Sequence, residues 1–333
     1  MITLTATAPE SLSRSAESTR PPLRVGLVQH RWRPDTTELV RVLRDGIDRA
    51  AGAGAALVCL PEITLLRYPA DIPAGPNPGE SAEDLTGGPT FALAAEAARA
   101  NGVFVHASLY EKATAEDGLG FNTAILVTPS GELAGYTRKL HIPISAGYYE
   151  DTYFRPGPGP GPVTGQADPY PVYNPEGLGA RVGLPTCWDE WFPEVARSYS
   201  LGGAEIVVYP TAIGSEPVFP AFDTQPLWQH VIVANGISSG LFMVVPNRIG
   251  DEGKVSFYGS SFISDPFGRV LVQAPRDEEA VLVADLDLDQ RRDWLELFPF
   301  LLTRRPDTYT ALTAPVDAQQ PYGVGHEATA VVK

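Results

Sequence analysis

Short runs of apolar and β-branched residues recur along the chain and are typical of buried strands. Four such runs are continuous and are bounded by polar or turn-forming residues. They are "LRVGLVQ" from Leu23, "AALVCL" ending at Leu60, "VFVHASL" from Val103 and "AEIVVYP" from Ala204. Turn residues interrupt two further segments, which therefore predict β-hairpins. The turns are Pro129-Ser130-Gly131 in "FNTAILVTPSGELAGYTRK" and Asp265-Pro266-Phe267-Gly268 in "YGSSFISDPFGRVLVQA".

Other segments carry the periodicity of amphipathic helices. Between residues 36 and 53 apolar side chains recur three and four residues apart, which predicts a helix with one buried face. Residues 90–102, "TFALAAEAARANG", are rich in alanine and end in an Asn-Gly stop signal. Helices that alternate with strands, with hairpins between them, predict a single α/β domain with a mixed sheet.

Residues 155–177, "RPGPGPGPVTGQADPYPVYNPEG", stand apart from this pattern. Prolines lack a backbone donor and glycines resist ordering, so neither a helix nor a central strand is expected here. We expect an extended or polyproline-like surface loop. Two interpretations stay open: a spacer, or a rim over the functional site.

Composition narrows the class of protein. The 333 residues carry a formal net charge of −15, which disfavours nucleic acid and anionic membranes as partners. No apolar run approaches the roughly 20 residues that span a bilayer. The two cysteines, Cys59 and Cys187, are too few for a disulfide framework and favour a reducing compartment. We therefore expect a soluble, cytoplasmic protein.

Three predicted strands end in side chains whose chemistry is complementary. Glu62 follows "LVCLP", Lys139 follows "GYTR" and Cys187 follows "VGLPT". A thiol with a pKa of about 8.5 is mostly protonated at neutral pH and needs a base or a cation to become a nucleophile. A carboxylate beside it can take the proton, and a lysine can hold a developing oxyanion. The three residues together indicate nucleophilic catalysis.

Each of these residues taken alone has an ordinary structural interpretation. A glutamate after a strand is usually a solvated loop residue, and a lysine is usually a surface charge. A free cysteine is usually a buried core residue. Cys59, which lies inside the apolar run "ALVCL", is predicted to be such a core residue.

Longer motifs surround the three residues, and together they resemble the nitrilase superfamily of carbon–nitrogen hydrolases. They are "LPE" at 60–62, "RKLHIP" at 138–143, "GYYEDTYFRPG" at 147–157 and "CWDEWFPEVARSYSLGGAEIVVYPTAIGSEP" at 187–217. The segments "ANGISSGLFMVVPNRIGDEG", "FYGSSFISDPFG" and "RRPDTY" extend the resemblance to about residues 23–314. Within the superfamily the motifs most resemble the N-carbamoylputrescine amidohydrolase branch.

The resemblance implies a four-layer αββα sandwich in a single domain, assembled into homodimers or larger homo-oligomers. The family's base, lysine and nucleophile fall on Glu62, Lys139 and Cys187, and a second glutamate falls on Glu150. The Lys139 ammonium and the backbone N–H of Trp188 are the implied oxyanion donors. No metal or organic cofactor is expected. Residues 1–22 are interpreted as a flexible polar tail, 23–314 as the hydrolase domain and 315–333 as a C-terminal tail.

The chain departs from that branch at four places around the expected pocket. Pro185 replaces a common aliphatic residue, Asp151 a common lysine and Glu190 a common glutamine. The loop at 155–177 is longer and richer in proline than is usual. These differences leave the chemistry intact but put the substrate in question.

The acids after the nucleophile indicate the charge of the substrate. Relatives that hydrolyse carbamoyl amino acids have arginines there to bind a carboxylate, whereas this chain has Asp189 and Glu190 followed by Trp191. Carboxylates beside a carboxylate substrate would be repelled in a desolvated site. Together with Glu216, they suit an ammonium group. The alternative is that these acids are structural hydrogen-bond acceptors or salt-bridge partners.

We therefore expect a cysteine amidohydrolase that releases ammonia from N-carbamoylputrescine or a similar cationic carbamoyl amine. The aromatic side chains of Trp188 and Tyr148 can flank the substrate's methylene chain or its cation, and His141 is the remaining candidate for binding. One alternative is an amidase or hydrazidase acting on a neutral linear amide. Another, of a different class, is an inactive small-molecule-binding protein.

Other site chemistries lack their patterns in this sequence. The five histidines, at positions 30, 106, 141, 230 and 326, show no spacing for zinc ligands. The prolines in "GPGPGP" remove the N–H groups that would cradle a phosphate. "YGSSF" lacks the Gly-x-Ser-x-Gly pattern of a serine nucleophile elbow.

Overall fold

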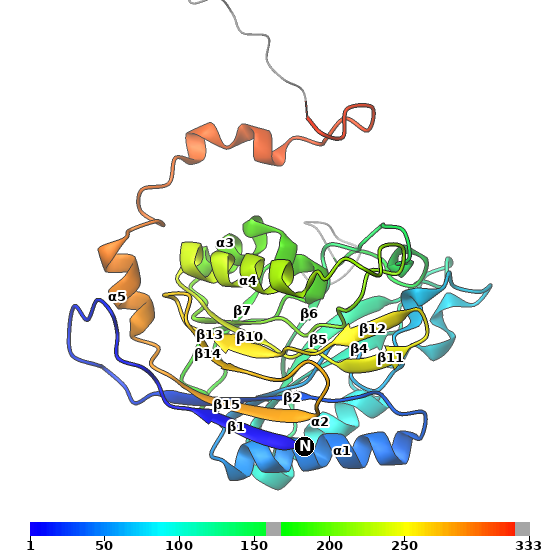
Figure 1. Ribbon diagram of the computed structural model, residues 1–333, viewed down its shortest axis with the longest axis horizontal. Coiled ribbons are helices and arrows are strands. Elements are labelled where there is room, and N and C mark those ends of the chain that lie inside the picture. The colour runs from blue at the N-terminus through cyan, green and yellow to red at the C-terminus, as the bar shows by residue number, and fades with distance from the viewer. Residues whose placement is uncertain (158–167, 324–333) are drawn as a thin grey trace, which may run out of the picture.

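Two packed sheets form the centre of the molecule, with helices on their outer faces (Figure 1). The structure, a computed structural model, describes residues 1–157 and 168–323. Part of the predicted proline-rich loop (158–167) and the end of the predicted C-terminal tail (324–333) lie outside the described residues. The predicted four-layer αββα sandwich is confirmed.

The first sheet has seven strands in the order β1-β15-β2-β3-β4-β5-β6. Its strands are β1 (Ile2–Ala6), β2 (Leu23–Gln29), β3 (Leu57–Cys59), β4 (Phe104–Glu111), β5 (Phe121–Val127), β6 (Leu133–Arg138) and β15 (Ala280–Leu286). The central pairs β2·β3 and β3·β4 are parallel, and the β4·β5 and β5·β6 pairs are antiparallel. The sheet is therefore mixed, as the alternation of helices and hairpins predicts.

The second sheet has six strands in the order β14-β13-β10-β9-β8-β7. Its strands are β7 (Val172–Tyr173), β8 (Val182–Gly183), β9 (Ile206–Val208), β10 (Phe242–Val245), β13 (Phe262–Ser264) and β14 (Val270–Gln273). A separate two-stranded sheet consists of β11 (Ile249–Glu252) and β12 (Val255–Tyr258). Both predicted hairpins, β5–β6 and β13–β14, form as antiparallel pairs. Gly131 and Gly268 adopt φ of +80° and +84° in their turns, a conformation that glycine takes without strain.

Two helix pairs cover the sheets. Helices α1 (Thr36–Gly52) and α2 (Pro89–Asn101) lie on the first sheet, and α3 (Pro193–Leu201) and α4 (Gln225–Ser239) lie on the second (Figure 1). Asp35 caps α1 by accepting hydrogen bonds from the N–H groups of Thr37 and Glu38. Helix α5 (Gln290–Leu297) follows β15. The short 3₁₀ helices are η1 (Pro69–Asp71), η2 (Pro78–Ser81), η3 (Glu150–Thr152), η4 (Cys187–Trp191), η5 (Pro306–Thr308) and η6 (Thr310–Thr313).

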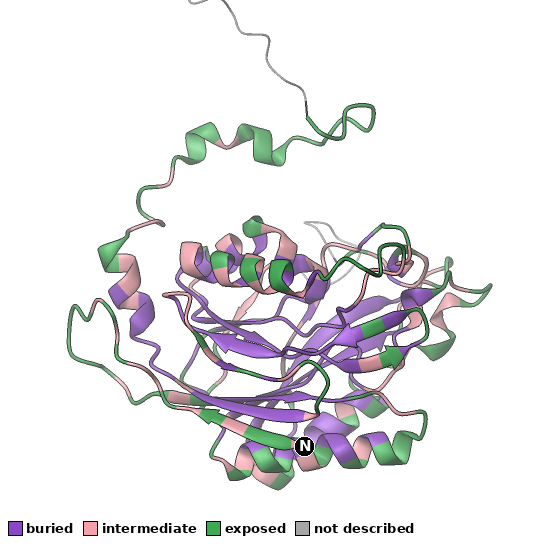
Figure 2. Ribbon diagram, in the orientation of Figure 1, coloured by how far each residue is buried: buried purple, intermediate pink, exposed green. Residues whose placement is uncertain are grey.

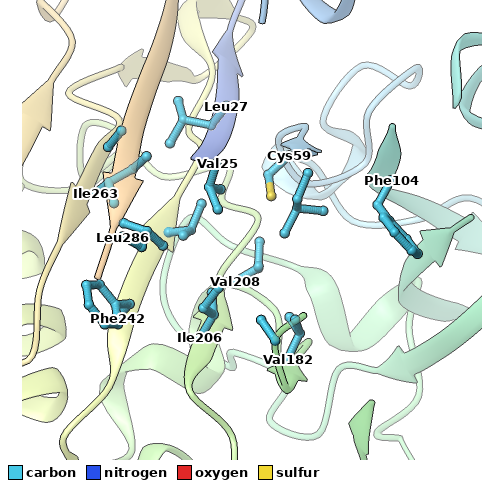
Figure 3. Packing of buried hydrophobic residues seen from close by; sticks show 14 of the residues in the cluster. Val25, Leu27, Cys59, Phe104, Val182, Ile206, Val208, Phe242, Ile263 and Leu286 are labelled. Atoms are coloured by element: carbon cyan, nitrogen blue, oxygen red, sulfur yellow. The ribbon is translucent and has the colours of Figure 1, made fainter. Parts of the chain in front are cut away.

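The apolar core lies between the two sheets. Side chains from both sheets, Leu27 and Phe104 from one and Ile206 and Phe242 from the other, belong to one buried cluster (Figure 3). Burying a side chain of this size stabilises a fold by about 1.5–3 kcal/mol. Cys59 belongs to this cluster, and burial raises the pKa of its thiol well above the usual range. It is the core residue that its apolar neighbours in sequence predict.

The N-terminal residues differ from the predicted flexible tail. Ile2–Ala6 form strand β1, which pairs in parallel with β15 at the edge of the first sheet. The next residues cross α5, where Ser11, Ser15 and Arg14 bond to the carboxylate of Asp293 (Figure 1). The alternation of apolar and polar residues in "ITLTA" suits an edge strand with one buried face. Residues 1–22 are therefore ordered against the domain.

After α5 the chain passes outside α3, with which residues 300–313 line a shared cavity, and it is largely exposed (Figure 2). Its apolar side chains include Leu302, with 88% of its surface exposed, and Leu312, with 63% exposed. Among the described residues, no helix is both long enough and apolar enough to span a bilayer.

Candidate active site

Glu62, Lys139 and Cys187 lie just beyond the ends of β3, β6 and β8, and each is less than a tenth exposed. β3 and β6 belong to the first sheet and β8 to the second. The three groups therefore meet where the two sheets face each other. The Nζ of Lys139 lies 3.0 Å from Oε1 of Glu62, and the charges of both side chains act on the pKa of Cys187.

Three donors hold the carboxylate of Glu62. The Asn122 side chain and the Lys139 ammonium donate to Oε1, at 2.7 and 3.0 Å, and the Ala212 N–H donates to Oε2 at 2.9 Å. Such bonds satisfy a buried carboxylate and fix its orientation. The carboxylate of Glu62 is thus held in one orientation in a site with little access to water.

Lys139 lies between two carboxylates. Its Nζ donates to Glu62 at 3.0 Å and to Glu150 at 2.6 Å. Burial opposes the charge of Lys139, but Glu150 and Glu62 together raise the pKa of this lysine well above its ordinary value. The hydroxyl of Tyr68 donates to the other oxygen of Glu150 at 2.9 Å. Lys139 is therefore a fixed ammonium whose position Glu150 controls.

Cys187 occupies a strained position at the start of η4. Its φ is +38°, in the left-handed region that favours glycine, and its N–H donates to the carbonyl of Pro210 at 3.0 Å. Burial, and then the negative charge of Glu62, raise the pKa of the Cys187 thiol well above its ordinary value, while Lys139 opposes the shift. The sulfur therefore rests as a thiol beside a carboxylate that can take its proton.

The turn that carries Cys187 has a period of three residues, because i and i+3 side chains eclipse in a 3₁₀ helix. Trp188 and Trp191 form one face, with ring centroids 6.1 Å apart, and both line the cavity described below. Asp189, on the next face, accepts the Thr186 N–H at 3.1 Å and the His141 N–H at 3.0 Å. Asp189 thus ties the segment after Lys139 to the nucleophile turn.

A cavity of about 320 Å³ opens beside Cys187. Its lining is largely aromatic and aliphatic: Tyr68, Pro143, Ser145, Tyr148, Glu150, Cys187, Trp188, Trp191, Ala212, Ile213, Glu216, Phe222, Thr224 and Leu227. Among these described residues there is no lysine or arginine, and two are carboxylates. No hydrogen bond or ion pair of the described residues reaches the carboxylate of Glu216. The cavity can hold a small elongated molecule and offers it negative charge.

The structure separates the six predicted substrate-binding residues into two groups. Trp188, Tyr148 and Glu216 line the cavity. The other three, Asp189, Glu190 and His141, do not line it. Asp189 is fully buried and accepts hydrogen bonds from the backbone, and Glu190 is a fully buried residue of η4.

His141 points away from the cavity as well. Its ring stacks on Phe192 with centroids 3.8 Å apart, and its Nδ1 lies 2.7 Å from the Asp189 carboxylate. The interpretation of Asp189 as a structural hydrogen-bond acceptor, left open above, is therefore the one that fits. A binding role for His141 finds no support in this geometry.

The residues that differ from the N-carbamoylputrescine amidohydrolase branch have little effect on the site geometry. β8 ends at Gly183, so Pro185 removes no donor from the sheet. Asp151 is exposed in η3 and does not line the cavity. Pro185 and Glu190 are both buried, and Glu190 lies within the turn that carries Cys187.

Three supporting groups were absent from the sequence-based predictions. Asn122 holds Glu62, Tyr68 holds Glu150, and the Ala212 N–H binds Glu62. Asn122 could have been noticed in the sequence, since it is a polar residue near the start of the apolar run "FNTAILV". A backbone donor such as Ala212 leaves no such signal. No cluster of three or more potential metal ligands occurs in the described part of the chain.

Comparisons with known proteins all indicate one family of hydrolases. A family model described as carbon-nitrogen hydrolase matches residues 24–296. An N-carbamoylputrescine amidase of Arabidopsis thaliana is 37% identical over 232 residues, which are 67% of this chain and 73% of that protein. A citrullinase of Francisella tularensis is 32% identical over 294 residues, which are 86% of this chain and 96% of that protein.

A solved structure agrees with both sequence matches. The carbon-nitrogen hydrolase of Helicobacter pylori G27 superposes with a TM-score of 0.74 at 29% identity. The superposition covers 87% of this chain and 98% of that one. The likeness therefore extends over nearly the whole sandwich and not over a single motif.

Proposed function

Since the chain belongs to the carbon-nitrogen hydrolase family and cleaves the carbon–nitrogen bonds of amides, we propose that Cys187 is its nucleophile. The observation that carries this proposal is the convergence of Glu62, Lys139 and Glu150 beside a thiol that borders a cavity of about 320 Å³. In the first step, the Cys187 proton passes to Glu62 and the sulfur bonds to the substrate carbonyl carbon.

The carbonyl oxygen then carries the negative charge. The Lys139 ammonium and the N–H of Trp188 are the donors for this oxyanion, and each such donor is typically worth about 3–4 kcal/mol. Glu150 keeps Lys139 in place and Tyr68 keeps Glu150 in place. These donors are fixed before the substrate arrives, so little reorganisation opposes the reaction.

Collapse of the tetrahedral intermediate breaks the carbon–nitrogen bond. Glu62 returns the proton to the departing nitrogen, ammonia leaves, and the acyl or carbamoyl group stays on the sulfur. Glu62 then takes a proton from water, whose oxygen attacks the same carbon and releases the thiol. For a carbamoyl amine this hydrolysis releases a carbamic acid, which breaks its remaining carbon–nitrogen bond to give the amine and carbon dioxide, so the final products are the amine, carbon dioxide and ammonia.

We propose a carbamoyl amine with a distal ammonium group, such as N-carbamoylputrescine, as the substrate. The unpaired carboxylate of Glu216 supports this assignment, and so does the lack of any arginine or lysine among the cavity residues. Glu216 follows a firmly held segment, because the Ser215 N–H donates to the Ser256 carbonyl at 2.8 Å. The Tyr148 hydroxyl donates to the Ser215 carbonyl at 3.0 Å.

Ammonia release over a substrate panel tests both proposals. The panel contains N-carbamoylputrescine, citrulline, 3-ureidopropionate and a neutral linear amide, with Cys187→Ala as the inactive control. We expect N-carbamoylputrescine to have the highest kcat/KM and Cys187→Ala to release no ammonia. A preference for 3-ureidopropionate contradicts the cationic substrate, and a preference for the neutral amide favours the amidase alternative. No turnover by the intact protein favours a binding protein.

A matched pair of variants isolates the ammonium contact. Glu216→Gln keeps the shape of the side chain and removes its charge. We expect it to lower kcat/KM for N-carbamoylputrescine roughly 10- to 100-fold, the equivalent of one hydrogen bond to a charged group, and to spare the neutral amide. Glu176→Gln, at an exposed position outside the cavity, serves as the control. Equal losses on both substrates would assign Glu216 a structural role instead.

We also propose that the chain works as a homo-oligomer in the cytoplasm. The exposed apolar side chains after α5 and the exposed Leu201 on α3 support a contact between copies. Two cysteines that are both free and buried suit a reducing compartment. Light scattering of the full chain and of a chain ending at residue 297 tests the assembly. A full chain that is monomeric at micromolar concentration contradicts it.

A further inference from the structure

Glu190 is a buried carboxyl group that the mechanism above does not use. It lies three residues after Cys187 in η4 and is completely inaccessible to solvent. Its backbone carbonyl accepts a hydrogen bond from the Asn235 side chain at 2.8 Å, which fixes the residue against α4. Neither carboxyl oxygen has a hydrogen-bond partner of normal geometry, and no ion pair reaches it from the described residues.

The surroundings of this carboxyl group disfavour a negative charge. Two other carboxylates act on it, Glu62 and Asp189. The nearby ammonium, Lys139, is already bonded to Glu62 and Glu150. An isolated ion in such a place costs several kcal/mol of desolvation, and the usual outcome is that the group takes a proton.

The remaining neighbours are neutral. They are Trp228 on α4, Tyr209 after β9 and Tyr258 at the end of β12, together with the thiol of Cys187 on the turn itself. The indole N–H of Trp228 and both phenol hydroxyls also lack partners of normal geometry. None of these neighbours carries a positive charge that could pair with an ionised Glu190.

We propose that Glu190 works as a neutral carboxylic acid within the turn that carries Cys187, and that its ionisation turns the enzyme off. Its role is that of a positioning residue, since it does not line the cavity. The second half of the proposal rests on the proposed role of Cys187. Attack by the sulfur adds negative charge to the carbonyl oxygen beside Glu62 and Glu150, and a third carboxylate next to them opposes that charge.

The direction of the pH effect follows from the same contacts. Burial, and then the charge of Glu62, raise the pKa of Glu190 well above its ordinary value, while Lys139 and Trp228 oppose the shift. At pH below that raised pKa the side chain is neutral and the site is active. At pH above it the side chain is ionised, so the effect appears as a loss of activity on the alkaline side.

Glu190→Gln tests the activity half, because glutamine has the same shape and is neutral at every pH. At neutral pH we expect its kcat/KM to stay within about threefold of wild type. One pH unit above the midpoint of the wild-type alkaline loss, wild type should retain about a tenth of the activity of E190Q. Glu194→Gln, an exposed neighbour at the start of α3, should keep the wild-type profile. An unchanged alkaline limb in E190Q overturns the switch.

Infrared spectroscopy tests the protonation half without any substrate. The difference spectrum of wild type minus E190Q should show the C=O stretch of a protonated carboxylic acid at neutral pH. That band should vanish with the same midpoint as the activity. Its absence at neutral pH overturns the proposal. A band at neutral pH in a protein that hydrolyses nothing would support the neutral acid and contradict the proposed function, so the two failures are distinguishable.

Discussion

At the scale of single residues, the site is organised around one ammonium shared by two carboxylates. Lys139 contacts both Glu62 and Glu150, and all three side chains are almost inaccessible to solvent. In a buried network of this kind, removing one partner leaves an uncompensated charge, which usually costs more than the bond itself. Glu150 is therefore expected to matter for stability and for catalysis together.

Glu150→Gln keeps the shape of the side chain and removes one of the two charges on Lys139. We expect the free energy of unfolding to fall by about 3 kcal/mol and kcat to fall at least tenfold, because the oxyanion donor loses its fixed position. Urea denaturation and steady-state kinetics measure the two effects. Tyr68→Phe, which removes only a neutral hydroxyl from Glu150, should have the smaller effect on both. A fully stable and active E150Q would contradict this role.

The residues at the ends of strands could be predicted from the sequence, but their orientation within η4 could not. Glu62, Lys139 and Cys187 each follow an apolar run, and the topology brings such ends together. Asp189 and Glu190 are closer to Cys187 in sequence than Trp191 is, yet they are buried away from the cavity that Trp191 lines. The period of a 3₁₀ helix groups Trp188 with Trp191, but it does not predict that Cys187 lines the cavity while Glu190, three residues later, does not.

At the scale of elements, the N-terminal residues form part of the domain. Strand β1 extends the first sheet beyond β15, and its Leu4 packs against the core between the sheets. The short period-two pattern of "ITLTA" was available in the sequence, but its polar surroundings favoured a tail. A strand of five residues gains its stability from the sheet that it joins, so local sequence predicts it poorly.

A pair of leucine substitutions separates a strand from a tail. Leu4→Ala should lower the free energy of unfolding by about 1–2 kcal/mol, since the side chain is partly buried against the core. Leu12→Ala lies on the segment that follows, where the side chain is 70% exposed, and should change it by less than about 0.5 kcal/mol. Denaturant midpoints with an unchanged m value measure both. Two neutral variants would mean that residues 1–22 are a free tail in solution.

At the scale of the whole molecule, two buried imidazole rings form no ion pair with the described residues: His106 on β4 and His30 just after β2. His30 and His106 are fully inaccessible to solvent, and burial lowers the pKa of each to about 3. Arg248 adds to the effect at His30. In the unfolded chain these rings take a proton near pH 6.5. Stability is therefore fully present above that pH and is lost as the pH falls towards the folded-state values.

Acid titration of stability checks this expectation. Between about pH 6 and pH 4, each histidine should reduce the free energy of unfolding by roughly 1.4 kcal/mol per pH unit. His106→Gln removes one of the two, so the slope should fall by that amount whatever the variant's absolute stability. His230→Gln, at an exposed position on α4, should leave the slope unchanged. Equal slopes in wild type and H106Q would contradict the neutral buried ring.

The short turn η4, which carries Cys187, also affects how the substrate specificity of this enzyme can change, in evolution or by design. Trp188 and Trp191 line the cavity, and they belong to the same short turn as Cys187. Exchanging them risks moving the reactive atom. The opposite wall, from Ile213 to Leu227, belongs to a separate segment. New specificities should therefore arise more readily there, and libraries confined to that segment should yield more active variants than libraries in the turn.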